Sequence, residues 1–308
     1  MRMVFMGTPD YSVKTLQLLY DKGHDIVGVF AQPDKPVGRK QILTPPPVKA
    51  LAEELNIPVF QPTTLRNGEA LEIIKQLNPE IIVVVAYGKI LPKEILNFAK
   101  YGCINGHASL LPKYRGASPI QWCIVCGEKQ TGVTIMQMDD GMDTGDILST
   151  EIVDIKPDET AEELFERLSL ISAELMVTTL EKIEKGEVTP IKQNDSEATY
   201  APIIKKEMAH LDFTQDAEIL ACAVRGYYSW PCAYFFLDGK RIKVISAKVS
   251  SKTSKNSGEV IDNNNRLVIS CGNNTSLELL TVQPEGSKTM TASQMLCGKK
   301  IPLGTKVN

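Results

Sequence analysis

The sequence predicts an α/β protein, with an open, mostly parallel sheet in its N-terminal part and a small β-barrel in its C-terminal part. Strand and helix patterns alternate over the first 150 residues, as is typical of βαβ units. Among them, Ile81–Val85 is a β-branched run without polar alternation, which indicates a strand buried on both faces of a parallel sheet. The last third contains short strand patterns separated by Gly and Asn, which favours a barrel.

The N-terminal elements follow from the spacing of apolar residues. We expect, in order, a strand at 1–6, a helix with its apolar stripe at 13–19, a strand at 26–30, helices at 48–55 and 71–77, a strand at 81–85 and a strand end at 103–105. Ligands of such sheets bind at the carboxyl ends of the strands. The polar clusters at those ends, residues 8–10, 87–89 and 105–107, are therefore candidate site segments.

Two capping boxes mark helix starts further along the chain. One begins at Ser118 and the other at Thr160, each with Glu or Gln three residues later. The second helix is long and is expected to end at Gly186. Between the two boxes, strands are expected at 131–138 and 147–155.

The remaining residues change in character. Residues 187–206 are polar and lack a long periodic pattern, which indicates a linker. Strand patterns follow at 233–236, 240–249, 258–260, 266–271 and 276–282. The expected organisation is therefore a first domain at 1–188, a linker at 189–206 and a second domain at 207–308.

Composition excludes several classes of protein. With 308 residues, 43% hydrophobic and 23% charged, the chain is neither a fibre nor disordered. Its longest apolar stretch, 81–87, is too short to span a membrane. An odd number of cysteines (seven) and no export signal favour reduced thiols and a cytoplasmic location. Three histidines and one isolated C-x-x-C pair argue against a metal site, so none is expected.

The charge is distributed unevenly. The net charge is −3, yet residues 206–308 contain 13 Lys and Arg against 9 Asp and Glu. A basic C-terminal third fits a polyanionic partner such as nucleic acid, although ordinary surface charge is an open alternative.

One loop is longer than the fold requires. Residues 33–48 contain five prolines together with Lys35, Arg39 and Lys40, where connections of two to six residues are usual. A long basic loop after a strand is usually functional, and the alternative is a surface excursion stiffened by proline.

The candidate reactive groups follow the strand that ends near residue 105. Asn105 and His107 point to the same side of an extended strand, and Asp143 lies in a glycine-flanked loop that could reach the imidazole. Amide and imidazole groups can stabilise an oxyanion, and a carboxylate can orient the imidazole and help to move a proton. This set suits acyl transfer to an amine. A histidine satisfied within the structure is the alternative. The Gly-x-Gly-x-x-Gly, P-loop and Gly-x-Ser-x-Gly patterns are absent from the sequence.

These residues resemble those of the 10-formyltetrahydrofolate-dependent formyltransferases. The resemblance is carried by Asn105-x-His107-x-Ser109-Leu110-Leu111-Pro112 and by Asp143 in Met142-Asp143-Thr144-Gly145. Further segments are similar to the methionyl-tRNA formyltransferase family: Gly7-Thr8-Pro9-Asp10, Gln32-Pro33-Asp34-Lys35-Pro36, Val85-Ala86-Tyr87-Gly88, Leu111-Pro112-Lys113-Tyr114-Arg115-Gly116 and Gly132-Val133-Thr134-Ile135-Met136. The similarity covers nearly the whole chain. It implies a Rossmann-like N-terminal domain and an OB-like C-terminal domain that binds tRNA.

The resemblance also implies residue roles. Asn105, His107 and Asp143 match the catalytic trio of the family. Folate-binding positions are Ser109, Leu110, Leu111, Pro112, Lys89 and Leu91, and tRNA-binding positions are Arg39, Lys35 and Lys40. The implied reaction transfers the formyl group of 10-formyltetrahydrofolate to initiator methionyl-tRNA for translation initiation and releases tetrahydrofolate. A monomer without a membrane partner is expected.

Two alternatives remain open at the level of the sequence. One is formyl transfer to a small amine, such as a ribonucleotide or an amino sugar, for which the long basic loop would be unnecessary. The other is an RNA-binding protein that retains a folate-like pocket without catalysis. The chain departs from the family at Gly106, where a branched apolar residue is usual, and this glycine should lose packing and add backbone freedom between Asn105 and His107.

Overall fold

The computed structural model describes residues 1–38, 40–254 and 256–308, and the chain folds into two compact units. The first unit comprises 1–116, 130–153 and 165–201, and the second comprises 117–129, 154–164 and 202–308. The second unit therefore contains two segments, 117–129 and 154–164, that precede the expected linker. The domain limits at 188 and 207 that the sequence indicates stay a prediction.

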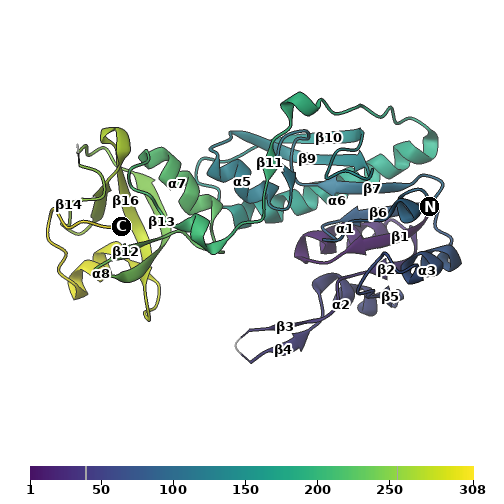
Figure 1. Ribbon diagram of the computed structural model, residues 1–308, viewed down its shortest axis with the longest axis horizontal. Helices are drawn as coiled ribbons and strands as arrows, with labels where there is room; N and C mark the ends of the chain where they lie inside the picture. The colour runs from purple at the N-terminus through teal and green to yellow at the C-terminus, as the bar shows by residue number, and fades with distance from the viewer. Residues whose placement is uncertain (39, 255) are drawn as a thin grey trace. The chain divides into compact units, whose positions relative to one another are not determined.

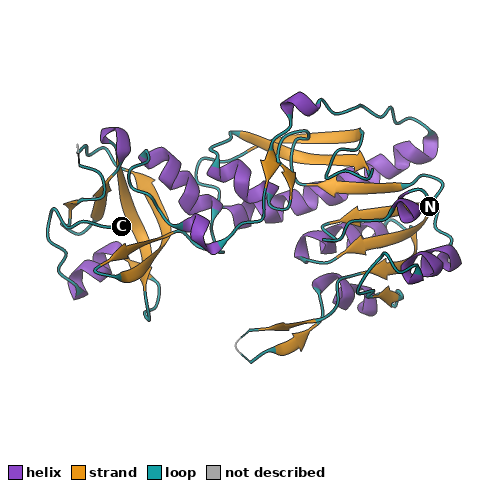
Figure 2. Cartoon of the chain, in the orientation of Figure 1, coloured by secondary structure: helices purple, strands orange, loops and turns teal. Residues whose placement is uncertain are grey.

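The first unit is built on a mostly parallel sheet with the strand order β10-β9-β7-β6-β1-β2-β5. Its strands are β1 Arg2–Gly7, β2 Asp25–Phe30, β5 Val59–Phe60, β6 Ile81–Val85, β7 Cys103–His107, β9 Gln130–Gln137 and β10 Ile147–Asp154. Pairing is parallel from β5 to β7, whereas β9 runs antiparallel to β7. Every residue of β6 is buried. The predicted parallel sheet is thus confirmed, and Figure 2 shows it as one layer of orange arrows.

The order of the strands creates a switch point between β1 and β6. The chain proceeds outward from β1 to β2 and β5, and then returns to place β6 on the other side of β1. Ligands of open α/β sheets bind at such a point, beyond the carboxyl ends of the strands. Thr8 follows β1 and Tyr87 follows β6, and the Thr8 hydroxyl donates a hydrogen bond of 3.1 Å to the Tyr87 carbonyl.

Helices of this unit are α1 Asp10–Asp21, α2 Pro47–Glu54, α3 Glu69–Leu77, α4 Lys93–Leu96 and α6 Ala161–Lys185, whose first turn groups with the second unit. The capping box at Thr160 is confirmed, since Glu163 accepts from the Thr160 N–H at 2.9 Å and donates its own N–H to the Thr160 hydroxyl at 3.3 Å. These bonds hold the pKa of Glu163 below its usual value. Gly186, with φ of +71°, follows the helix as predicted.

The other predicted box is wrong in its detail. Helix α5, Pro119–Val125, begins where expected, but the Ser118 side chain makes no capping hydrogen bond. The ψ angle of Ser118 is 46°, away from the extended conformation in which a capping hydroxyl reaches the second or third helical N–H. Proline at the first helical position still sets the start of α5.

The long loop at 33–48 contains a small hairpin that the sequence patterns did not indicate. Strands β3 Lys35–Val37 and β4 Ile42–Thr44 pair antiparallel, and all six of their residues are exposed. Figure 1 shows this hairpin extending away from the sheet of the first unit. Its side chains Val37, Ile42 and Leu43 are 56–65% exposed, so an apolar surface is presented to solvent.

The second unit is an antiparallel half-barrel with the order β12-β13-β16-β15-β14, and β17 pairs with β16. Its strands are β12 Tyr234–Leu237, β13 Lys240–Val249, β14 Val260–Asp262, β15 Leu267–Ser270, β16 Ser276–Pro284 and β17 Met290–Thr291. Helices α7 Ala217–Gly226 and α8 Ala292–Gly298 were not expected. Helix α5 joins this core: a Cβ at Gly226 would lie 2.5 Å from Cγ2 of Val125.

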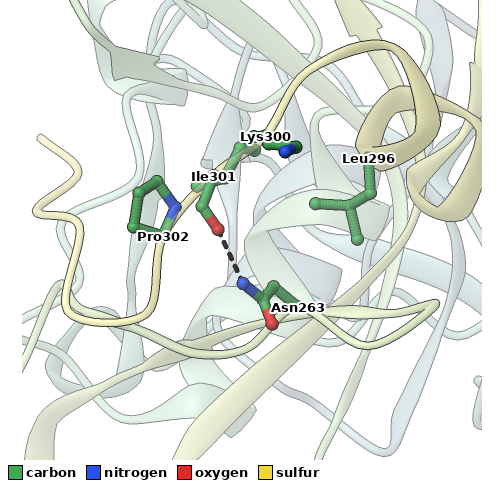
Figure 3. Close-up of a pocket in the computed structure, with 5 residues that line it drawn as sticks. All are labelled: Asn263, Leu296, Lys300, Ile301 and Pro302. Carbon is green, nitrogen blue, oxygen red and sulfur yellow. Dashed lines mark hydrogen bonds between the residues drawn. The ribbon is translucent and has the colours of Figure 1, made fainter.

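A pocket of about 290 Å³ opens in the second unit. It is lined by Asn263, Leu296, Lys300, Ile301 and Pro302, and the Asn263 amide donates to the Ile301 carbonyl at 2.8 Å (Figure 3). None of the residues predicted to react or to bind folate lines this pocket.

Candidate functional site

Strand β7 contains the two polar residues Asn105 and His107 and sets the direction of their side chains. Gly106 faces helix α6, because a Cβ built on it would lie 2.9 Å from Ser172 Oγ and 3.5 Å from Met176 Cε. Neighbouring side chains on a strand point to opposite faces, so Asn105 and His107 project on the side away from α6. Ser172 and Met176 of α6 fill the space that a larger side chain at 106 would occupy. Glycine at this position therefore loses less packing than the sequence indicates.

His107 is enclosed by two loops. Its imidazole is 7% exposed, with Nε2 3.0 Å from the carbonyl oxygen of Tyr114 and Nδ1 3.7 Å from Oδ2 of Asp143. The same carboxylate oxygen accepts a 2.8 Å hydrogen bond from the backbone N–H of Gly116. The structure thus brings His107 and Asp143 together, through loops that are distant in sequence.

The loop that carries Asp143 is pinned from within. Asp139 Oδ1 accepts hydrogen bonds from the Gly141 N–H at 3.0 Å and from the Thr144 hydroxyl at 2.7 Å. Asp143 itself has φ of +54°, a left-handed conformation that costs an L-residue about 1 kcal/mol or more. A Cβ at Gly145 would lie 1.7 Å from the Gln137 carbonyl, so only glycine fits there.

Residues 109–112, predicted to contact folate, form a compact turn directly after β7. The Thr134 hydroxyl on β9 donates to the Ser109 carbonyl at 2.7 Å and accepts from the Leu111 N–H at 3.2 Å. The Ser109 hydroxyl donates to the Lys113 carbonyl at 2.6 Å. Ser109 and Leu111 are buried, whereas Leu110 and Pro112 are partly exposed. These bonds tie the turn to the neighbouring strand.

Lys89 and Leu91 lie in the segment after β6, at the switch point. The Lys89 ammonium donates to the carbonyls of Pro62 and Thr63, and burial together with the nearby Lys35 lowers the pKa of Lys89. Leu91 is 4% exposed. The side chains of these two residues are therefore engaged by the protein itself.

Two of the three predicted tRNA-binding residues are described: Lys35 lies in β3, and Lys40 lies in the turn between β3 and β4. Lys35 and Lys40 are exposed, and Arg39 lies outside the described residues. The base of the hairpin is anchored: Asp34 accepts from Lys49 at 2.9 Å and from the Gln61 amide at 2.7 Å. These bonds hold the pKa of Asp34 below its usual value.

Sequence patterns missed two residues that support this site, Thr134 and Gln193. Thr134 is a fully buried hydroxyl between the apolar residues Val133 and Ile135 of β9, which is a usable signal. Gln193, in the expected linker, donates to the carbonyls of Asp143 and Gly145, each at 2.8 Å, and nothing in its local sequence indicated this.

The described part of the chain contains neither a metal cluster nor a membrane span. Among residues 1–38, 40–254 and 256–308, no group of three or more His, Cys, Asp or Glu could hold a metal ion. In the same residues, no helix has both the length and the apolar character needed to cross a membrane.

Comparison with known proteins shows the family of this chain. Residues 1–180 match the formyl transferase family, and residues 203–300 match the formyl transferase C-terminal domain. A protein named methionyl-tRNA formyltransferase from Caldanaerobacter subterraneus subsp. tengcongensis is 47% identical over 307 residues, which cover 99% of each chain.

Solved structures agree on the fold. Methionyl-tRNA formyltransferase from Clostridium thermocellum is 25% identical with a TM-score of 0.57, over 80% of this chain and 93% of that chain. An N-formyltransferase from Helicobacter canadensis, solved with folinic acid and dTDP-3-aminofucose, is 20% identical with a TM-score of 0.71, over 92% of this chain and 99% of that one. HypX from Aquifex aeolicus, solved with tetrahydrofolic acid, is 17% identical with a TM-score of 0.63 over 96% of this chain, which spans 47% of that longer protein. On the evidence of the two domain matches and the full-length relative, the chain belongs to the formyl transferase family.

Proposed function

We propose that this chain transfers the formyl group of 10-formyltetrahydrofolate to the amino group of initiator methionyl-tRNA. The observation that carries the proposal is the His107–Asp143 pair, 3.7 Å apart, directly beside the 109–112 turn at the end of β7. Full-length relatives 44–47% identical to the chain are named methionyl-tRNA formyltransferase. The proposed location is the cytoplasm, and the proposed form is a monomer.

The proposed chemistry uses three side chains. The amino nitrogen of the acceptor forms a bond to the formyl carbon, the bond from that carbon to the donor nitrogen breaks, and the proton lost by the amine passes to the donor nitrogen. Negative charge develops on the formyl oxygen during this step, and Asn105 and His107 stabilise it as hydrogen-bond donors. For His107 this requires Nε2 to exchange the Tyr114 carbonyl for the formyl oxygen. Asp143 orients the imidazole and assists proton movement.

The folate donor is proposed to lie at the switch point, beyond the carboxyl ends of β1 and β6. Ser109–Pro112 would contact it from one side and the backbone of Lys89–Leu91 from the other. The support is the anchoring of both segments: Thr134 bonds the 109–112 turn, and the Lys89 side chain is tied to the 62–63 carbonyls. Rigid backbone segments can bind a planar ring with little loss of entropy.

The tRNA acceptor end is proposed to contact the β3–β4 hairpin through Arg39, Lys35 and Lys40. Support comes from the anchored base at Asp34 and from a surface that combines exposed apolar and basic residues. A small amine would not need such an extension. Formyl transfer to an amino sugar nevertheless stays the alternative, because relatives of the same fold include an N-formyltransferase solved with an amino-sugar nucleotide.

One assay separates these possibilities. Purified protein is given 10-formyltetrahydrofolate labelled in the formyl group, together with methionyl-tRNA, a dTDP-amino sugar or an aminoribonucleotide. We expect label to enter methionyl-tRNA at a kcat/KM at least about 100-fold above that for either small amine, because only tRNA uses the hairpin. Preferred labelling of a small amine would establish the alternative, and no transfer to any acceptor would contradict the proposed function.

A further inference from the structure

Residues 191–201, predicted to be a linker, run along both loops that enclose His107. Ile191 bridges to Ile147, and Tyr200–Ala201 pairs in parallel with Arg115–Gly116. Between these contacts, the Thr199 carbonyl accepts from the Arg115 N–H at 2.9 Å. The segment is therefore part of the first unit, and its attachment points are the loops at 112–116 and 143–147.

Gln193 is the side chain in this segment that joins the two loops. Its amide nitrogen donates to the carbonyls of Asp143 and Gly145, both at 2.8 Å. Its amide oxygen accepts from Arg115 Nε at 3.1 Å and from Nη2 at 2.8 Å. An amide has two N–H donors and two acceptor lone pairs, so Gln193 uses its full hydrogen-bonding capacity here.

The partner on the other side, Arg115, is 2% exposed. Its charged partner Asp195 accepts at 2.7 Å but is 81% exposed, so water screens that ion pair. A buried guanidinium is costly unless its N–H groups are bonded, and Gln193 supplies two of those bonds. Arg115 is therefore held by two bonds to the Gln193 amide in addition to the exposed pair with Asp195.

These contacts close a ring around Asp143. Starting at Arg115, the ring passes through the Gln193 amide to the Asp143 carbonyl. It then passes through the Asp143 carboxylate to the N–H of Gly116, which follows Arg115 in the chain. The ring holds Asp143 at both ends, by its carbonyl and by its side chain. Because the φ of Asp143 is +54°, release of the carbonyl would let the backbone relax and turn the carboxylate away from His107.

We propose that Gln193 is a positioning residue for the formyl transfer reaction. It keeps the Asp143 carboxylate against the His107 imidazole by clamping the two carbonyls of the Asp143 loop to the buried Arg115. This inference rests on the proposed function for its kinetic consequences. Its structural consequence, the placement of Asp143 beside His107, can be measured without turnover.

The test compares Gln193→Glu, Gln193→Met and, as a matched control from the same segment, Lys192→Met, whose side chain is exposed. Glu retains an acceptor for Arg115 but cannot donate to the two carbonyls, and Met does neither. We expect kcat for methionyl-tRNA to fall about 10- to 100-fold in both Gln193 variants, since small misplacements of reacting groups have effects of this size. KM for either substrate should change less than about 3-fold, and Lys192→Met should match the unmodified protein.

A spectroscopic measurement keeps the inference independent of activity. The chain has three histidines, so ring nitrogen resonances of His107 can be assigned in ¹⁵N-histidine-labelled protein with a His107→Gln variant. In Gln193→Glu, the His107 resonances should move while those of His24 and His210 stay in place. Unmoved His107 resonances, or a kcat within 2-fold of the unmodified protein in a folded Gln193→Glu variant, would overturn the proposal. If the unmodified protein itself transfers no formyl group while the His107 resonances move, the proposed function fails and the positioning role stands.

Discussion

Oδ2 of Asp143 lies 3.7 Å from Nδ1 of His107 and at the same time accepts a 2.8 Å hydrogen bond from the Gly116 N–H. The backbone bond fixes the direction of the carboxylate, so the gap to the imidazole is set by the loop and not by the histidine alone. A carboxylate held in this way can stabilise the positive charge of a protonated His107 ring without first moving from its place in the loop.

Asp143→Asn should separate orientation from charge. The amide oxygen can still accept a hydrogen bond from the Gly116 N–H, so the Asp143 loop and the turn at 109–112 should keep their structure. The variant cannot carry the negative charge that faces His107, and we expect kcat to fall at least about 100-fold. Folate affinity, measured by fluorescence titration, should change less than about 3-fold. Loss of folate binding together with normal turnover of bound substrate would make Asp143 a binding residue instead.

His107→Ala and Asn105→Ala should each remove an oxyanion donor. Loss of one such donor typically lowers the rate by about 100- to 1,000-fold. Both side chains project away from the α6 face, so the fold should be retained, which circular dichroism can verify. Single-turnover formyl transfer measures the effect. A rate within about 5-fold of the unmodified enzyme in either variant contradicts the assigned role.

The parts of this structure that the sequence predicts are those with a local signature. Ile81–Val85 is apolar throughout and is buried throughout, and Thr160 with Glu163 forms its capping box within four residues. Gln193 has no such signature, because its partners Asp143 and Arg115 lie 50 and 78 positions away. The β3–β4 hairpin was missed for another reason: its strands have three exposed residues each, so they lack the alternation that burial produces.

The site shows the same limit. The side chains of Asn105 and His107 point to the same face of the sheet because side chains alternate along any strand, so this could be predicted from the sequence. The Tyr114 carbonyl contacts His107, and the Gly116 N–H donates to Asp143. Both contacts depend on how the 112–116 loop folds back, which no spacing in the sequence indicates.

Gly106 and Ser172 should be energetically coupled. A Cβ at residue 106 would come within 2.9 Å of Ser172 Oγ, which is too close, although Met176 and Ile135 would be at ordinary contact distances. Gly106→Ala alone should therefore be nearly neutral, since the gain from a stiffer unfolded chain is offset by the crowding. In a Ser172→Ala background the same change should stabilise the fold by about 0.5–1 kcal/mol. Gly298→Ala, where nothing lies within 4 Å, serves as the uncrowded control. Urea unfolding of the four variants measures the coupling, and strict additivity would refute it.

Asp262 should make the second unit sensitive to acid. Its side chain is 11% exposed and pairs with Lys252 at 2.7 Å and Arg266 at 2.8 Å, contacts that hold the pKa of Asp262 well below its usual range. A lowered pKa in the folded state stabilises the protein above the unfolded value of about 3.9. That contribution is lost as the pH falls below this value toward the folded pKa.

Asp262→Asn should thus destabilise the protein at neutral pH by about 1–3 kcal/mol, the range for hydrogen bonds to charged groups. The difference from the unmodified protein should shrink between about pH 4 and pH 2. Asp238→Asn is the matched control, because Asp238 pairs with Lys299 at 2.8 Å but is 66% exposed. Thermal unfolding across this pH range measures both variants, and a difference that does not vary with pH would show that the charge of Asp262 is unimportant.

The basic residues at 206–308, which lie in the second unit, should contribute tRNA affinity that depends on salt. Lys240 and Lys300 are exposed, and each is available to bind a phosphate. Deleting residues beyond 205 would be a poor test, because α5 would lose the core that it shares with α7. Point substitutions keep that core intact.

The Lys240→Ala/Lys300→Ala variant should bind tRNA more weakly, and its plot of log K against log salt should be flatter by up to about 0.9 for each phosphate that the protein no longer neutralises. Turnover at saturating tRNA should change little, because neither residue belongs to the first unit that carries His107. A Lys75→Ala/Lys182→Ala variant, which removes the same charge from exposed positions of α3 and α6, controls for net charge. Equal slopes in the two variants would mean that tRNA responds only to the overall charge of the protein, and the assignment of a phosphate footprint to the second unit would then be wrong.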